Sequence, residues 1–356
     1  MPRLALLTGS HGAVLEAVEL ELERSGWRVH HVPGGADGRL HQEVDTRDAE
    51  AVVHLGLRSP RELDEPLRAA AEASAASAAA QLARRAGVRR LVHVSTAAVY
   101  GAPRNLPCRE GEQKLPRTAL ERIRWRAEQA SWAEFRQGAP LTVLRPSILY
   151  GPTLRGGPAR ALSFVTLFND RRRRIPIVRR GPVAHLLHLE DLARAVRHVL
   201  DHPRDDEVVG RAFNVADDAP LPLGEHLAAA LEALGYLPGR ILPTLPRLWA
   251  VGLWLIRNVP DRALLDRLNG RLSHHWRRLS SRAGVAPVLL PKVDREALHW
   301  MSADHYYDTS RLSSLGWRPR YPVTVDAFPE TIRALVEAGI LPGPSGGTPA
   351  PTALEG

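Results

Sequence analysis

The chain of 356 residues has one cysteine, Cys108, two lysines, Lys114 and Lys292, and only 5% aromatic residues. A single cysteine excludes an internal disulfide framework and any zinc or iron–sulfur site built from several thiolates, as is typical of a reducing compartment. No run of about 18 apolar residues occurs, and the first residues lack the order of a secretory signal. These absences predict a cytoplasmic protein without a spanning helix.

Negative charge is also in deficit, with 39 Asp and Glu against 48 Lys and Arg, for a net charge of +9. Such an excess can indicate a nucleic-acid or anionic-membrane partner. The excess is almost all arginine in an alanine-rich chain, which indicates a compositional bias, and we expect no specific nucleic acid. The densest cluster, residues 171–174 with Arg179 and Arg180, is interpreted as a solvated basic loop. Its alternative role is contact with a phosphate or a lipid headgroup.

Apolar and polar stretches alternate along the first 150 residues in the manner of strands and helices. An apolar run at 4–7, a glycine turn, an amphipathic stretch at 13–24 and a second strand at 27–32 form a βαβ unit of about 30 residues. Further strands are predicted at 51–55, 90–95 and 141–145, with helices at 67–86 and 118–137 between them. This alternation predicts a doubly wound parallel sheet of the α/β class.

A glycine turn joins the first strand to the first helix. Gly9 and Gly12 occupy it, and small residues there let backbone amides approach a pyrophosphate that the helix N-terminus favours. Many strand-to-helix turns contain glycine for steric reasons alone, so the turn is a weak signal by itself. Its position at the first crossover strengthens the interpretation.

Several segments together resemble a known family. The turn TGSHG at 8–12 is similar to its TGxxG start, VSTAAVYG at 94–101 to its SSxxVYG segment, and LRPSILYGP at 144–152 to its RPxxVYGP segment. The family is the extended short-chain dehydrogenases/reductases, the NAD-dependent epimerase/dehydratase group, and the resemblance covers about residues 3–338. Further matching segments are VVHL at 52–55, HLEDLA at 188–193, FNV at 213–215 and LGWRP at 315–319.

The resemblance implies a Rossmann-like doubly wound sheet with a smaller C-terminal substrate-covering region, NAD or NADP as the cofactor, a small-molecule substrate and a homodimer. We expect an NAD(P)-binding domain at 1–180, a substrate region interleaved with the sheet at 181–340 and a disordered tail at 341–356. No metal site is expected. The implied cofactor contacts are Gly9, Ser10, His11, Gly12, Ala13, Val14, Leu55, Arg124 and Pro146.

The proton-transfer motif of the family is altered in this chain. Family members pass a hydride between nicotinamide and substrate while the tyrosine of a YxxxK motif exchanges the hydroxyl proton. Counting back from Glu128 places Leu120 at the tyrosine position and Arg124 at the lysine position. Leucine has no proton to give, whereas arginine can still bind ribose hydroxyls. Thr96 and Arg124 are therefore the candidate catalytic residues, and an active enzyme would take its proton from Tyr100, a histidine or ordered water.

The cofactor side departs from the family as well. The third glycine of the turn is replaced by Leu15, whose bulk is expected to hinder close packing of the helix on the sheet. Pro33 stands where an acidic residue would bind the adenosine ribose, and the next acid is Asp37. Glu72 falls at the position of a family asparagine.

The C-terminal part points to an apolar substrate. The segment LPRLWAVGLWLI at 245–256 is too short to span a bilayer, and it is interpreted as a buried helix, the lip of an apolar pocket or a membrane-surface contact. YDTSR at 307–311 followed by LGWRP resembles the 3β-hydroxysteroid and sterol dehydrogenase branch. We therefore expect a sterol-like hydroxy or keto substrate.

Two functions stay open, with a minor third. The first is an NAD(P)-binding oxidoreductase with a degenerate active site, and the second is an inactive member that serves as a binding or scaffolding module. Joint loss of the tyrosine, the lysine, the third glycine and the acid of the second strand is what relaxed selection on catalysis would produce, and it keeps the second function beside the first. Binding to nucleic acid or anionic lipid through arginines is the third. Weaker candidates are set aside as metal ligands or nucleophiles: His185, His188, His274, His275, Ser95 and Ser147.

Overall fold

The computed structural model describes residues 3–35, 37–40, 45–56, 64–168, 177–178, 181–236, 241–242, 262–293, 300 and 303–343. The chain forms two compact units and passes between them five times. The units alternate along the chain, since later segments return to the first unit. The first unit comprises Met1–Ile148, His185–Asp218 and His305–Pro322, and the second comprises Leu149–Ala184, Ala219–Asp304 and Val323–Gly356.

The first unit is built on a six-stranded sheet in the order β10-β5-β4-β3-β1-β2, and all five neighbouring pairs are parallel. The predicted doubly wound parallel sheet is confirmed. Its last strand, β10, comes from the second segment of the unit, which explains why a boundary at 180 divides the sheet. The strands are β1 (Leu4–Thr8), β2 (Arg28–Val32), β3 (Ala49–His54), β4 (Arg90–Val94), β5 (Leu141–Pro146) and β10 (Arg211–Val215).

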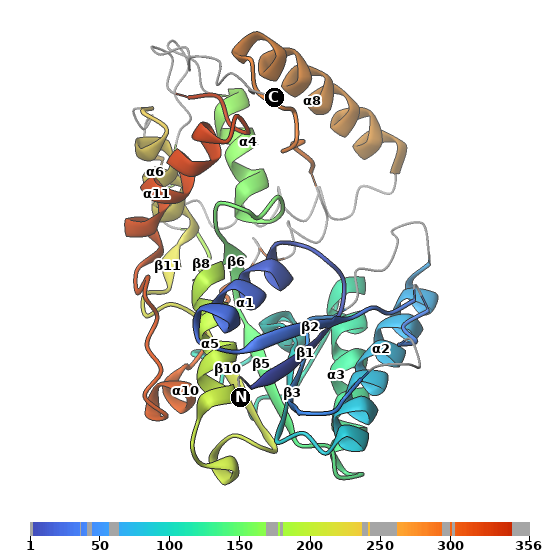
Figure 1. Cartoon of the computed structure of the whole chain (residues 1–356). Coiled ribbons are helices and arrows are strands. Elements are labelled where there is room, and N and C mark those ends of the chain that lie inside the picture. Colours follow the sequence, from blue (N-terminus) through green and yellow to red (C-terminus); the bar gives the residue numbers. More distant parts are fainter. Residues whose placement is uncertain are drawn as a thin grey trace. The chain divides into compact units, whose positions relative to one another are not determined.

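Four helices cover the sheet, with α1 packed beside α5 and α2 packed beside α3 (Figure 1). Between them lies a core that includes Leu6, Val52, Leu91 and Leu141, each with 0% exposure. Strands buried on both sides explain the nearly continuous apolar runs of the sequence. The helices are α1 (Ala13–Arg24), α2 (Glu65–Ala86), α3 (Ala119–Phe135) and α5 (Leu189–Asp201).

Local signals set the ends of the helices. Asp64 caps α2 by accepting a hydrogen bond from the Leu67 amide, and Gly87 ends the helix in the left-handed conformation. Thr118 and Glu121 form a capping box at the start of α3. The helix α2 begins two residues before its predicted start and ends where predicted, and α3 begins one residue after its predicted start. Shorter elements of the unit are η1 (Ala97–Tyr100), β9 (Leu186–His188), η2 (Asp205–Glu207) and α10 (Ser310–Ser314).

The second unit is mainly helical, with two short strand pairs, β8 with β11 and β7 with β12. Within it α6 packs on α11 and α4 contacts α8. β6 (Ile148–Tyr150) spans the first passage of the chain between the units. The elements are α4 (Pro158–Phe168), β7 (Ile177–Val178), β8 (Val183–Ala184), β11 (Leu221–Pro222), α6 (Leu223–Ala233), β12 (Ile241–Leu242), α8 (Arg262–Ala283) and α11 (Thr324–Glu337).

Three sequence predictions fall on parts of the chain outside the described residues. They concern the basic cluster at 171–180, of which only 177–178 are described, the apolar segment at 245–256 and the tail beyond 343. Within the described parts, no helix combines the length and apolar character needed to cross a bilayer.

Candidate functional site

The turn between β1 and α1 has a backbone that requires glycine. Gly9 has a φ of +125°, and a Cβ at this position would lie 2.6 Å from the carbonyl oxygen of Gly56. The amide of Ser10 donates a hydrogen bond to the same oxygen at 3.1 Å. The end of β3 therefore packs directly against the turn, and only glycine permits that approach.

Gly12 ends the turn and caps α1. Its φ is +155°, no side chain caps the helix there, and a Cβ on Gly12 would meet no atom within 4 Å. Open space thus adjoins the first turn of α1, where backbone N–H groups have no partner inside the helix. A helix start of this kind favours a negatively charged group. The turn fits the diphosphate of a dinucleotide.

The side chains of the turn differ in exposure. His11 is exposed, and its ring lies 5.1 Å from that of His31 on β2. Ser10, Ala13 and Val14 are half-buried. Leu15, expected to hinder packing of α1, is only 2% exposed. The leucine is therefore accommodated within the core.

The end of β2 does not offer the acidic residue of the family. Pro33 is exposed at this place. The carboxylate of Asp37 accepts a hydrogen bond from the Arg39 amide at 3.0 Å and pairs with the Arg39 side chain at 3.4 Å. Asp37 is thus engaged with its own loop. The residues at β2 do not reproduce the family's contact to the adenosine ribose.

Arg124 lies over the end of β3. A Cβ on Gly56 would collide with the Arg124 guanidinium, whose Nη1 donates a hydrogen bond to Oε2 of Glu72 at 2.9 Å. Glu72, on α2, is 3% exposed, whereas the Arg124 side chain is 28% exposed. Arg124 therefore joins α2, α3 and the β3 end, beside the Gly9–Gly56 contact. The sequence identified both residues but not their ion pair.

Leu120 and Thr96 lie on neighbouring elements. Leu120, in the first turn of α3, is 38% exposed. Thr96 is half-buried after β4, and its Oγ1 accepts a hydrogen bond from the Ala98 amide at 3.2 Å. The Thr96 oxygen thus acts as an acceptor within η1, and its hydroxyl hydrogen can still be donated. Leu120 has no group that can transfer a proton.

The other two implied cofactor contacts lie on different strands. The amide of Leu55, just after β3, donates to the carbonyl of Thr8 at 3.0 Å, so Leu55 adjoins the glycine turn. Pro146 ends β5 and pairs in register with Val215 of β10. In the sheet order, β4 separates β5 from β3. The structure therefore brings Leu55 to the turn and places Pro146 at the end of β5, two strands from β3 and three from β1 along the same edge.

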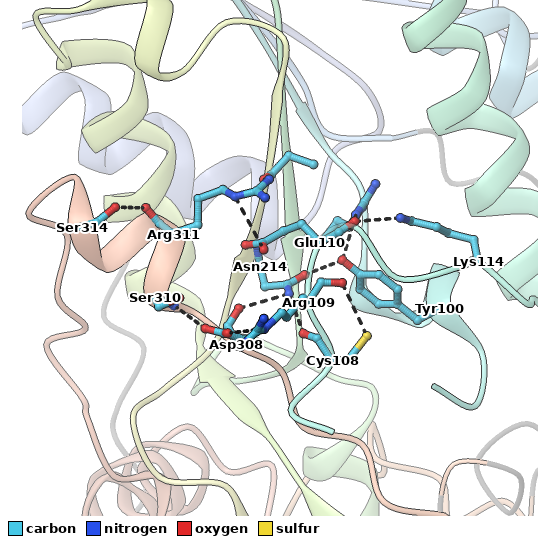
Figure 2. Close-up of polar contacts among 12 residues, drawn as sticks. Tyr100, Cys108, Arg109, Glu110, Lys114, Asn214, Asp308, Ser310, Arg311 and Ser314 are labelled. Atoms are coloured by element: carbon cyan, nitrogen blue, oxygen red, sulfur yellow. Dashed lines mark hydrogen bonds and ion pairs between the residues drawn. The ribbon is translucent and has the colours of Figure 1, made fainter. Parts of the chain in front are cut away.

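Tyr100 is locked in the interior. It is 0% exposed, and its hydroxyl donates to Oδ1 of Asn214 at 2.7 Å (Figure 2). The same oxygen accepts a hydrogen bond from Nη1 of Arg145 at 2.7 Å. Burial raises the pKa of Tyr100, although Arg145 opposes this effect. The suggestion that Tyr100 replaces the missing tyrosine is therefore wrong, because its hydroxyl has no access to a substrate.

A buried ion pair continues this network. Arg145 donates to Glu128 from Nη2 at 2.6 Å and from Nε at 3.2 Å. Ser95 and Trp132 donate to the same carboxylate at 2.6 and 3.1 Å. Burial would raise the pKa of Glu128, but Arg145 and these hydrogen bonds bring it below its ordinary value. Ser95 thus serves the core as a hydrogen-bond donor.

Asn214 links the sheet to two other segments. Its side-chain amide donates to the backbone oxygens of Cys108 and Asp308, at 3.0 and 3.1 Å, and its backbone amide donates to Glu110 at 3.1 Å (Figure 2). Burial raises the pKa of the Cys108 thiol to about 12, so the only cysteine is a neutral core residue at neutral pH. The sequence did not foresee these links, which join residues about 100 positions apart.

Two histidines at the ends of β3 and β4 form a second buried polar group. His54 shares a hydrogen bond of 2.9 Å with Thr8, and His93 shares one of 2.7 Å with Ser131. The two rings lie 5.2 Å apart. Burial and then the charges of Arg124 and Arg145 lower the pKa of His93 to about 3, and burial also lowers that of His54. Both are neutral at pH 7. In the sequence, the feature that could have indicated this pair is a histidine within each of two apolar strands.

The other histidines set aside as metal ligands have different partners. His185 lies 3.2 Å from a carboxylate oxygen of Asp217, and His188 caps α5. His274 and His275 are exposed on α8. Among the described residues, no group of three or more His, Cys, Asp or Glu side chains could hold a metal ion.

The fold and the turn define a Rossmann-like α/β protein. The chain belongs to the NAD dependent epimerase/dehydratase family, whose model matches residues 5–216. Comparison with curated protein sequences gives no match.

Solved structures of similar fold agree with this assignment. The terminal R domain of the myxalamid PKS-NRPS biosynthetic pathway is 17% identical, with a TM-score of 0.66 over 97% of this chain and 93% of that chain. The enzyme WbmG of Bordetella bronchiseptica, solved with NAD and UDP, is 16% identical, with a TM-score of 0.62 over 95% and 96%. A short-chain dehydrogenase/reductase superfamily protein of Agrobacterium tumefaciens with bound NAD is 19% identical, with a TM-score of 0.62 over 94% and 97%. At these identities the likeness concerns the fold.

Proposed function

We propose that the chain binds NAD or NADP at the β1–α1 turn and acts as a binding module that does not use the family's tyrosine-dependent proton transfer. The observation that carries this proposal is the contrast between two positions of one unit. The glycine turn keeps its backbone geometry at Gly9 and Gly12, whereas Leu120 stands 38% exposed at the tyrosine position. This contrast supports dinucleotide binding without the acid–base group.

Binding would rest on a few residues. The backbone amides of His11 to Val14 would hold the diphosphate at the start of α1, and Ser10 and Leu55 would flank it. Arg124 would offer the remaining N–H groups of its guanidinium to ribose hydroxyls, oriented by its ion pair with Glu72. Without an acid at the end of β2, the adenosine ribose gains less from this chain than is usual in the family.

A second candidate, an oxidoreductase acting on a hydroxy or keto substrate, is favoured by Thr96. When bound, NAD(P) supplies a hydride donor or acceptor. Because its oxygen already accepts from Ala98, the Thr96 hydroxyl can donate to a substrate oxygen and orient it. An apolar cavity in the second unit, lined by Tyr150, Leu162 and Phe328, holds about 20 Å³. That is room for one water molecule, so it lends no support to a sterol.

A titration with NADH and NADPH tests binding. The purified protein is titrated while nicotinamide fluorescence and thermal shift are recorded. We expect saturable binding by the wild type. His11→Glu places a carboxylate at the exposed turn and should weaken binding by roughly fivefold to tenfold through repulsion of the diphosphate. His274→Glu, the same change on an exposed position of α8, is the matched control and should leave affinity unchanged.

The outcomes separate the candidates. Absence of a fluorescence change and of a thermal shift at millimolar cofactor contradicts dinucleotide binding. Equal loss in both histidine variants contradicts the location at the turn. Turnover followed at the nicotinamide absorbance with hydroxysteroids and nucleotide sugars then decides the chemistry. The binding module predicts no turnover, and a rate that falls on Thr96→Val establishes the oxidoreductase instead.

A further inference from the structure

The helix α8 of the second unit carries a dense row of basic side chains, which we name the α8 basic face. No Asp or Glu occurs from residue 267 to residue 282. The helix is continuous over its 22 residues (Figure 1). Within α8, Asp266 is the acidic residue nearest to residues 267–282. The α8 basic face consists of Arg267, Arg271, His274, His275, Arg277, Arg278 and Arg282, all exposed.

Packing fixes the side of α8 that faces the protein. Leu272, Trp276 and Ser280, spaced four residues apart, are 9%, 0% and 0% exposed. The Asn269 side chain makes two hydrogen bonds to the backbone of Val293, at 2.7 and 3.1 Å. Residues at such spacing lie on one side of a helix, so the opposite side is held toward solvent. The orientation of the basic side chains therefore follows from the core contacts.

The charge of this face is not neutralised by the described part of the chain. Elsewhere exposed arginines pair with acids, as Arg122 does with Glu65 at 2.6 Å and Arg197 with Glu21 at 2.9 Å. The described residues provide no such ion pair to the arginines of the α8 basic face. On the same face His274, Arg277, Arg278 and Arg282 surround an open, shallow area of surface beside Ser281. Closely spaced basic side chains on an open surface can contact phosphate groups.

We propose that the α8 basic face docks on an anionic lipid surface. Clusters of four to eight Lys and Arg on an amphipathic helix are typical of contact with acidic phospholipid headgroups. Leu268 is 42% exposed and follows the same helical stripe as Arg271, His275, Arg278 and Arg282. An apolar side chain gains free energy at a bilayer interface, whereas a phosphate backbone offers it no partner. The mixture of charge and exposed leucine favours a lipid surface over a nucleic acid.

Vesicle flotation tests the proposal on the full chain. The probes are vesicles of phosphatidylcholine alone and vesicles with about 30% phosphatidylglycerol. We expect binding only to the anionic vesicles, with a loss on raising salt from 50 to 500 mM as screening grows. The triple variant Arg277→Gln, Arg278→Gln, Arg282→Gln should lower the partition coefficient by roughly 100-fold, since each basic residue near such a surface contributes about tenfold or less.

A matched variant separates local from general charge. Arg24→Gln, Arg28→Gln, Arg136→Gln removes the same charge from exposed positions of the first unit and should leave vesicle binding unchanged. Circular dichroism and NADH titration check that both triple variants stay folded. Three results would overturn the proposal: no flotation of the wild type at low salt, equal loss in both variants, or a duplex DNA or RNA that binds through the same arginines while vesicles do not. None of them bears on dinucleotide binding, which concerns the first unit.

Discussion

Two polar regions of the first unit, the buried hydrogen-bond network and the residues at the strand ends, differ in how well they match the pattern of the family. Beneath the strand ends, Tyr100, Arg145 and Asn214 form hydrogen bonds that link strands to loops, with Arg145 also paired to a buried carboxylate. The glycine turn at the strand ends has the backbone that the sequence predicted, whereas Leu120, at the predicted position of the family's tyrosine, is a 38% exposed side chain that cannot transfer a proton. Segments that resemble the family supplied the interior residues. A family match of this kind therefore reports the scaffold more faithfully than the chemistry.

The largest expected effect is in the interior. Arg145→Met leaves the Glu128 carboxylate, 0% exposed, without its cation, and should lower the free energy of unfolding by about 3–5 kcal/mol. Urea unfolding measures the change. Arg122→Met removes the exposed arginine that pairs with Glu65 and should cost below about 1 kcal/mol. Equal losses of unfolding free energy in the two variants would contradict the distinction between the buried and the exposed ion pair.

The glycine turn at the strand ends is expected to be nearly as sensitive to substitution as the interior. Gly9→Ala places a Cβ 2.6 Å from the Gly56 oxygen in a strained backbone, and should cost about 2–3 kcal/mol. Gly12→Ala meets no neighbouring atom within 4 Å and should cost less. Urea midpoints of the two variants compare them. A smaller loss for Gly9→Ala would show that the β3 end can move away from the turn.

Burial of His93 should make the free energy of unfolding depend on pH in the acid range. The folded pKa of His93 is about 3, below the ordinary value near 6.5, so the unfolded chain binds a proton that the folded chain does not between these values. The contribution of neutral His93 to the free energy of unfolding is therefore full above about pH 6.5, and it is lost as the pH falls toward 3. His93→Gln should reduce the slope of unfolding free energy against pH by about 1.4 kcal/mol per unit between about pH 4 and 6. Exposed His30→Gln is the control, and an unchanged slope in His93→Gln would mean that the native state protonates His93.

The smallest effect is expected at the tyrosine position. Leu120→Tyr enlarges a side chain that is already 38% exposed, so the free energy of unfolding should change by less than about 0.5 kcal/mol. Thermal unfolding in parallel with the wild type measures it. A loss above about 1 kcal/mol would place Leu120 among the structural residues and weaken the contrast with Arg145.

Sequence periodicity and glycine positions were sufficient to predict the sheet, because its strands are apolar and its helices begin and end at recognisable residues such as Thr118 and Gly87. The position of Gly12 at the start of α1 was predicted for the same reason. The pairing of Arg124 with Glu72 was not, since it joins residues 52 positions apart on two helices. The burial of Tyr100 was missed because a tyrosine in a motif does not reveal which way its ring points.

The chain passes between its units five times, and this affects whether either unit can be exchanged as a module. The first unit is completed late in the chain. Segments of the second unit precede both strand β10 and the segment His305–Pro322 in the sequence. A cut at any one place in the gene would leave a sheet without its last strand or a helical unit in fragments. Neither unit is therefore a contiguous stretch of sequence that a single fusion point could exchange as a module.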